Sequence, residues 1–261
     1  MAALSWDLHL HPGPSAVPRW GDGLRIWEAA RDAGVRGFVW KSHEEHTVTR
    51  CHALPAGPPF AIPSVSLNPW ATCESVIEAI EQGARWIWGP SRDAAGSPGW
   101  ELPLPSWWSR LREYLAATTR QVALATSHLD QHGRLGFAEI AASNRALGCT
   151  VTHSLYLSDS DADELAGLGC TFEFDLYTAT FPEPGRPAQD LAARCAAFME
   201  RGYPLYLTSD AGQAQVGNPF EFSARALLDL SSARGPAFVQ AIAVDGPARF
   251  VRRILPAEVA A

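Results

Sequence analysis

The segment Ser5-Trp6-Asp7-Leu8-His9-Leu10 opens the chain with a run of strand length. The stretch 24–33 that follows has helical spacing and ends at Gly34, and Arg36-Gly37-Phe38-Val39-Trp40-Lys41 is a second strand-like run. A strand, a helix and another strand in this order form a parallel βαβ unit. The start of the chain therefore predicts a parallel sheet with helices on its outside.

The same alternation continues to the end of the chain. We expect further strands over 60–67, 84–88, 121–127, 149–152, 170–174 and 204–208, and helices over 71–82, 107–118, 136–147, 160–168, 188–201, 219–230 and 236–243. Pro- and Gly-rich stretches at 89–106 and 180–187 predict loops. Eight strand–helix units in 261 residues favour a closed α/β barrel, (β/α)8, as a single domain over residues 1–261. No Gly-x-Gly-x-x-Gly follows the first strand, which disfavours a dinucleotide-binding fold.

Composition narrows the classes of partner. Apolar residues make up 47% of the chain and charged residues 19%, and the net charge is −7. Basic residues form no run, so we expect a small-molecule substrate and neither nucleic acid nor a membrane as partner. Assembly into a homo-oligomer is left open.

The five cysteines form no Cys-x-x-Cys pair, and we expect no signal peptide; together these predict a reduced, cytoplasmic protein. Cys149 and Cys170 are expected in the core. The ten tryptophans have two interpretations: they pack in the core, or some of them form an aromatic wall over a pocket.

Polar residues recur where the expected strands end. The carboxyl ends of barrel strands converge on one face, so these side chains are predicted to share a pocket. They are His9, His11, Lys41, His43, His128, His153, Glu173 and Asp210.

A metal centre is the interpretation that unites these residues. Side chains two apart on a strand share a face, so His9 and His11 are expected to project into the barrel mouth while Leu8 and Leu10 point outward. Imidazoles and a carboxylate suit Zn²⁺ first, with Mn²⁺, Fe²⁺ or Co²⁺ also possible, at one or two ions per chain. Each residue alone has a structural alternative, a core histidine or a helix-capping aspartate. The predicted ligands are His9, His11, Lys41, His128, His153 and Asp210, and Asp210 is also the predicted general base.

Lys41 has three open interpretations. Its amine can bridge two metals after carboxylation by CO₂, bind a substrate carboxylate, or be structural, and an unmodified ammonium beside two dications is electrostatically poor. Asp7 either orients a ligand histidine or caps the strand end. Arg19, His43 and Glu173 are predicted substrate contacts; for Arg19 this is a guanidinium bound to a carboxylate, with solvent exposure as the alternative.

Asp7-x-His9-x-His11, His128, His153 and Asp210 together resemble the amidohydrolase superfamily over nearly the whole chain. The segments 41–43, 66–69 and 209–213 are similar to a compact subgroup of unassigned function. The resemblance implies a barrel enzyme with one or two metals, His9 and His11 holding the buried ion and His128 and His153 the second. The family's bridging lysine ends strand four, where this chain has Trp88-Gly89-Pro90; Lys41 ends strand two instead.

The leading functional hypothesis is a metal-dependent hydrolase of the amidohydrolase or lactonase type. Metal-bound hydroxide would attack a carbonyl of a small amide, cyclic imide or lactone, with Asp210 as base. The alternatives are a phosphoester hydrolase of the histidinol-phosphatase-like type, disfavoured because the loops show no cluster of basic residues, and a metal-dependent decarboxylase. A non-enzymatic binding module is the least favoured reading.

Overall fold

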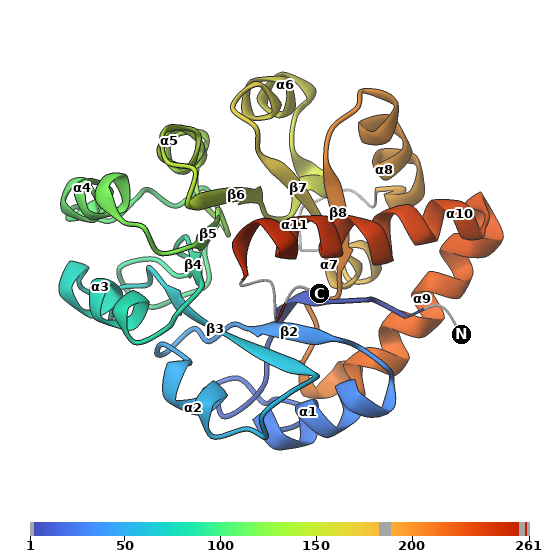
Figure 1. Ribbon diagram of the computed structural model, residues 1–261. Coiled ribbons are helices and arrows are strands. Elements are labelled where there is room, and N and C mark those ends of the chain that lie inside the picture. Colours follow the sequence, from blue (N-terminus) through green and yellow to red (C-terminus); the bar gives the residue numbers. More distant parts are fainter. Residues whose placement is uncertain (1–2, 183–188, 256–258, 260–261) are drawn as a thin grey trace.

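The computed structural model describes residues 3–182, 189–255 and 259. Eight parallel strands stand in the order β1 to β8 and form the barrel seen nearly end-on in Figure 1. Helices surround it, as the alternation predicts, and the predicted (β/α)8 fold is confirmed. The strands are β1 Asp7–Leu10, β2 Gly37–Trp40, β3 Phe60–Ser66, β4 Trp86–Trp88, β5 Val122–Ala125, β6 Leu147–Val151, β7 Thr171–Asp175 and β8 Leu205–Thr208.

Most helices begin at an Asp, Ser, Thr or Asn whose side chain accepts a backbone N–H of the first turn. No helix of the described residues is long and apolar enough to cross a membrane. The helices are α1 Gly23–Asp32, α2 Val48–His52, α3 Cys73–Glu81, α4 Trp108–Ala117, α5 Gln131–Ser143, α6 Asp159–Gly167, α7 Leu176–Thr180, α8 Leu191–Glu200, α9 Pro219–Arg234, α10 Pro236–Val239 and α11 Gly246–Ile254, with a π-helical turn at Gln240–Asp245.

Several predicted boundaries are wrong. The helix expected over 136–147 is α5, which starts earlier because Asp130 accepts the N–H of Gly133 at 2.7 Å. It also ends earlier, so Leu147 begins β6 instead of ending a helix. Helices α2, α7 and α11 were not expected, whereas the loop over 89–106 has neither helix nor strand, as predicted. Most of the predicted loop 180–187, and the predicted start of the next helix at residue 188, lie outside the described residues.

The apolar core has an outer part, between strands and helices, and an inner part inside the barrel. The inner cluster contains Trp6, Leu8, Val39, Ile62, Trp86, Trp88, Ala123, Ala125, Tyr206, Phe250, Val251, Ile254 and Leu255. Leu10 lies in the outer part, as expected, but Leu8 does not point outward. The register between β1 and β2 shifts between Asp7 and Leu10, and this irregularity places Leu8 inside the barrel ahead of His9.

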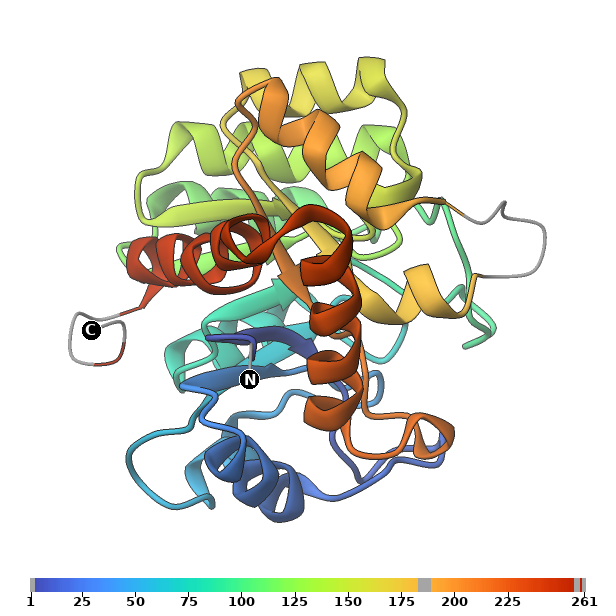
Figure 2. The same ribbon diagram turned by 90° about the vertical axis from the view of Figure 1, so that its right-hand side faces the viewer.

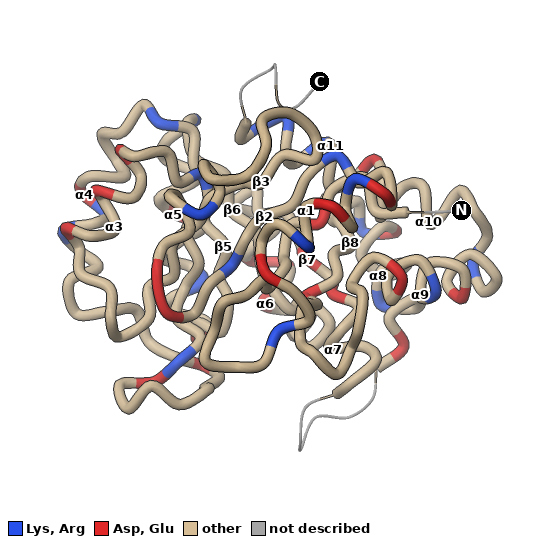
Figure 3. Tube along the Cα trace, turned by 90° about the horizontal axis from the view of Figure 1, so that it is seen from below, with Lys and Arg blue, Asp and Glu red and all other residues tan. Residues whose placement is uncertain are grey.

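Helix α11 covers the amino-terminal end of the barrel. Its Phe250 ring lies 5.4 Å from that of Trp86 and 5.6 Å from that of Tyr206, and Ile254 packs against Gly148 near the start of β6. In Figure 2, α11 and α7 lie at opposite ends of the barrel. Figure 3 shows acidic and basic residues interspersed over the outer helices. Because α11 fills the amino-terminal end, the interior of the barrel is left accessible at the carboxyl ends of the strands.

The barrel closes between β8 and β1 through few contacts. The N–H of His11 donates to the carbonyl of Ala211 at 2.9 Å. The carboxylate of Asp7 accepts the hydroxyls of Thr208 and Ser209, each at 2.6 Å. Gly212 has φ +121, and a Cβ there would meet the carbonyl of His11 at 2.3 Å. Asp7 thus joins the strand ends, and of its two predicted roles this placement favours the structural one.

Candidate metal centre

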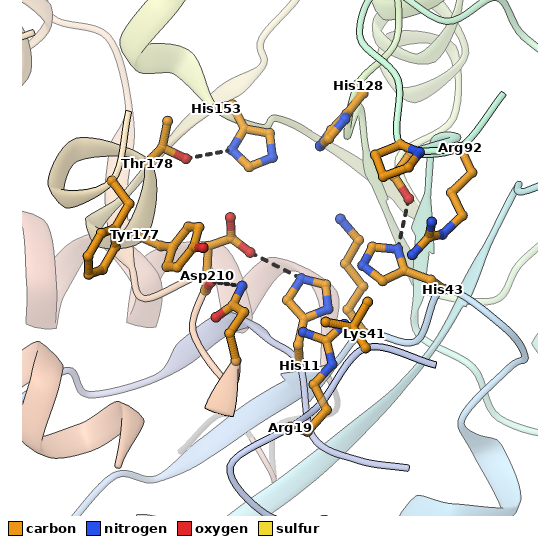
Figure 4. A pocket seen from close by; sticks show the side chains of 15 residues that line it. His11, Arg19, Lys41, His43, Arg92, His128, His153, Tyr177, Thr178 and Asp210 are labelled. Carbon is orange, nitrogen blue, oxygen red and sulfur yellow. Dashed lines mark hydrogen bonds and ion pairs between the residues drawn. The ribbon is translucent and has the colours of Figure 1, made fainter. Parts of the chain in front are cut away.

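The polar residues predicted from the strand ends do converge. Figure 4 shows the cavity at the carboxyl end of the barrel, with a volume of about 200 Å³. Two predicted residues, His9 and Glu173, lie beneath its surface and do not line it. The predicted residues that do line it are His11, Arg19, Lys41, His43, His128, His153 and Asp210.

Backbone strain is concentrated at the same strand ends. Ser127, His153 and Asp210 have φ of 49, 56 and 49, in the left-handed region that non-glycine residues avoid. They follow β5, β6 and β8. Such conformations cost on the order of 1–3 kcal/mol each and cluster at functional sites, where packing holds a side chain in a required direction.

The carboxylate of Asp210 lies close to both His9 of β1 and His11, which follows that strand. Its Oδ1 lies 3.2 Å from Nε2 of His9 and 3.1 Å from Nε2 of His11. Two ligands held 2.0–2.1 Å from a tetrahedral Zn²⁺ are about 3.3 Å apart, so both distances match an edge of that coordination polyhedron. Burial holds the pKa values of both imidazoles well below their usual range. Neutral imidazoles are the form that binds a metal.

His153 presents a nitrogen without a partner. Its Nδ1 donates to Oδ2 of Asp175 at 2.9 Å, and Asp175 is itself fixed by the N–H of Thr178 at 2.6 Å. This leaves Nε2 of His153 buried with no hydrogen-bond partner. A carboxylate on one imidazole nitrogen is the usual support for a metal on the other. Ligand atoms of His9, His153 and Asp210 all lie within 4.8 Å of one another, so these three residues fit a metal ion.

Glu173 supports His9 from below. Its Oε1 lies 2.7 Å from Nδ1 of His9, and its Oε2 accepts the hydroxyl of Tyr206 at 3.0 Å. Burial, then the neighbouring carboxylates of Asp175 and Asp210, raise the pKa of Glu173 well above its usual value. The predicted substrate contact does not agree with this position, because the side chain is wholly buried under His9. Glu173 instead turns Nε2 of His9 toward Asp210.

Lys41 reaches the same point from β2. Its Nζ lies 3.1 Å from Nε2 of His9, donates to Oγ of Ser127 at 3.2 Å and lies 4.5 Å from the centre of the Trp88 ring. Burial lowers the pKa of this amine to about 8. The lysine therefore extends from the end of β2 across to Ser127, which follows β5, and passes within contact distance of His9. Its bridging role stays a prediction.

His128 and His43 stand further out in the cavity. His128 donates from Nδ1 to the carbonyl of Gly99 at 2.6 Å and stacks on Trp100, with ring centres 4.0 Å apart. Nδ1 of His43 lies 2.9 Å from Oγ of Ser91. Burial lowers the pKa of both rings. Neither belongs to the tight cluster of His9, His153 and Asp210, so a second metal at His128 stays a prediction.

The tryptophans divide between the two interpretations. Trp86 and Trp88 are fully buried in the inner cluster and act in packing. The ring of Trp100 stacks on that of His128 and its centre lies 5.2 Å from that of His153, so it contacts two residues that line the cavity. Cys149 and Cys170 are buried, as predicted, and all five cysteines are free.

Sequence reasoning missed three parts of the site. Asp175 lies two residues after Glu173 and so shares its face of the strand, a signal that was available. Ser127, which holds Lys41, directly precedes His128. Arg92 and Tyr177, which also line the cavity, come from a loop and a short helix whose course no sequence pattern indicates.

Comparison with known proteins supports the fold. A family model described as "Family of unknown function (DUF6282)" matches residues 5–99, which covers β1 to β4. No curated protein matches the sequence. Forty-three chains of solved structures match, so the three described next are a selection.

A Pseudomonas putida protein assigned as a 2-pyrone-4,6-dicarboxylic acid hydrolase has 16% identity and a TM-score of 0.59, with 98% of this chain and 100% of that chain covered. A zinc-bound amidohydrolase from Burkholderia multivorans has 13% identity and a TM-score of 0.60, over 97% and 100%. The A. niger ochratoxinase has 12% identity and a TM-score of 0.57, over 93% and 70%. The chain thus has the barrel fold of amidohydrolases, as the predicted resemblance requires.

Proposed function

We propose that this protein is a metal-dependent hydrolase that opens a carbonyl ester or amide bond in a small ring, such as a lactone or cyclic imide. The observation that carries the proposal is the cluster of His9, His153 and Asp210, in which the buried Nε2 of His153 has no partner. The names of the structural neighbours, which include an amidohydrolase with bound zinc and a pyrone dicarboxylic acid hydrolase, support the same reaction class.

The metal ion would be held by His9, His153 and Asp210, with His11 on the other side of the Asp210 oxygen. A divalent ion in such a site polarises a carbonyl and lowers the pKa of water to roughly 7. Zn²⁺ is the first candidate because the donors are imidazole nitrogens and a carboxylate oxygen.

The protein's own residues would handle the protons. Burial, then the nearby Asp175, raises the pKa of Asp210 to about 7. A carboxylate with this pKa can take a proton from water near neutral pH and return it to the leaving atom of the opened ring. The strained backbone at Asp210, with φ 49, holds its oxygen toward the cavity. The cavity of about 200 Å³ is below the usual range of sites for drug-sized ligands, which favours a small substrate.

Metal analysis of the purified protein tests the first half of the proposal. We expect about one or two transition-metal ions per chain, and a large loss of metal in His153→Ala. The matched control is His132→Ala, which removes an exposed histidine of α5 and should leave the metal content unchanged. A protein that neither binds nor is activated by a divalent metal would contradict the proposal.

A substrate panel tests the second half. Lactones, cyclic imides, phosphoesters and carboxylates are each offered to the metal-loaded protein, with ring opening, phosphate release and CO₂ release as readouts. We expect ring opening. Phosphate release alone would establish the phosphoesterase alternative, and CO₂ release alone the decarboxylase.

A further inference from the structure

The cavity is positively charged in a protein whose net charge is −7. Three cationic side chains line it, Arg19, Lys41 and Arg92, against the single carboxylate of Asp210 among the lining residues. The expectation that the loops show no cluster of basic residues is wrong. Arg19 follows β1 and Arg92 follows β4, so they are far apart in sequence and meet only because the loops fold over one opening.

Arg19 has an unused donor inside the protein. Its Nε is buried and has no hydrogen-bond partner. Among the carboxylates, Glu44 raises the pKa of Arg19 most. Its oxygens, however, accept hydrogen bonds from the hydroxyls of Ser15 at 3.0 Å and Ser42 at 3.3 Å. Among the described residues no carboxylate forms an ion pair with Arg19. A desolvated guanidinium with a free N–H is a site for an external acceptor.

Arg92 lies on the His43 side of the cavity, with its guanidinium beside the His43 ring in Figure 4. One guanidinium nitrogen donates to the carbonyl of Gly96 at 3.0 Å, and no described carboxylate pairs with the rest. Asp210 and His153, the candidate metal ligands, lie across the cavity in the same view.

Both arginines sit on backbone that is fixed by the neighbouring loop. Arg19 pairs with Gln213, and the flanking Trp20 N–H donates to Gly212 at 2.9 Å. The N–H of Arg92 donates to Oδ1 of Asn68 at 3.1 Å. Donors placed before the ligand arrives bind at a lower entropic cost.

We propose that Arg19 and Arg92 bind a carboxylate group of the substrate, so that the preferred substrates are small rings that carry a carboxylate away from the bond that is cleaved. The planar fork of arginine matches an oxyanion of this shape. The carboxylate would lie toward His43 while the reacting carbonyl lies toward Asp210 and His153. This inference rests on the proposed function for the identity of the reacting bond, but the anion site itself can be tested separately.

Binding measurements test the anion site without catalysis. We would titrate the metal-loaded protein with succinate and glutarate and with their half-amides, succinamate and glutaramate. Each pair differs by one charged oxygen group, so its ratio of dissociation constants isolates the second carboxylate. We expect the better dicarboxylate to bind at least about tenfold more tightly than its half-amide, because the half-amide loses a charge-assisted hydrogen bond to a guanidinium.

Variants assign that preference to residues. Arg19→Met and Arg92→Met should each reduce it severalfold and the double variant should abolish it. Arg36→Met removes an exposed arginine at the start of β2, at the other end of the barrel, and should leave it intact. A dicarboxylate preference that survives the double variant, or no binding of either dicarboxylate, would overturn the inference.

Two further arms separate this inference from the proposed function. Turnover of γ-butyrolactone is compared with that of its γ-carboxylate, and inorganic phosphate competes with glutarate. Arginine-dependent glutarate binding without turnover of either lactone would contradict the proposed function and leave the anion site standing. Faster turnover of the neutral lactone, or tighter binding of phosphate than of glutarate, would overturn the carboxylate assignment.

Discussion

The two ends of the barrel are built from the same strands, but one is apolar and closely packed while the other is polar and contains a cavity. At the amino end, Trp86, Tyr206 and Phe250 pack into the inner cluster under α11. At the carboxyl end the interior becomes polar, with Asp210 and His153 in strained backbone around a cavity. Under the proposed function, stability is concentrated at one end and chemistry at the other, so substitutions at the two ends should affect different measurements.

The largest effect on chemistry is expected from Asp210→Asn, which keeps the shape of the side chain and removes the base. We expect the rate of ring opening to fall by about 10²–10⁴-fold. In the metal-free protein the free energy of unfolding should not fall, because a buried carboxylate is replaced by a neutral amide. Steady-state kinetics and urea unfolding check the two halves. Undiminished turnover would exclude Asp210 as the base.

The largest effect on stability is expected at the other end, from Phe250→Ala. The ring is 3% exposed and fills the inner cluster, so its loss should cost about 3–5 kcal/mol of unfolding free energy. The fraction that stays folded should keep its metal content and turnover. Leu228→Ala, at an exposed leucine of α9, is the control and should change stability by at most about 0.5 kcal/mol. Loss of turnover in the folded fraction of Phe250→Ala would contradict the view that the amino end of the barrel affects stability alone.

A smaller effect should follow from Asp175→Asn, which weakens the support of His153 without touching the cavity. We expect metal affinity to fall by about 10–100-fold. Competition with a chelator measures this affinity. Asp229→Asn, an exposed aspartate of α9, should leave it unchanged. Equal affinities in wild type and Asp175→Asn would argue that His153 is not a ligand.

The smallest effect is in the pH profile. The raised pKa of Asp210, about 7, means that its basic form is lost as the pH falls through that value. Turnover should therefore decline on the acid side, by about tenfold per pH unit below the midpoint. A bound cation stabilises the carboxylate and lowers the pKa, so the midpoint should lie at or below about 7. A midpoint well above this value would point to a different base.

The fold could be predicted because each strand–helix unit carries its own signal in sequence. Predicted helix boundaries were wrong where a single polar residue sets the start of the helix. Asp130 caps α5, so this helix begins five residues before its apolar pattern suggests. The missed α11 has a different cause. Its apolar residues are organised by the end of the barrel they cover, and that surface exists only after the strands have closed.

The candidate ligands could be predicted because strand ends converge by topology. Their partners could not all be found in this way. Period two places Asp175 beside Glu173, but only the structure shows that Asp175 holds His153 while Glu173 holds His9. Leu8 was misplaced because a shift in register between two strands leaves no mark in the residues themselves. Arg92 depends on the path of a loop, which the sequence does not specify.

The few contacts between β8 and β1 give the candidate metal a second consequence. His11 and Asp210 are 199 residues apart, and they face each other only when the last strand has joined the first. An ion held there binds the closed barrel and not the open chain, so it would raise the free energy of unfolding by about 2.7 kcal/mol at a concentration of 100 times its dissociation constant. The metal would then link the first and last strands of the barrel, and its removal by a chelator should lower the melting temperature as well as the turnover.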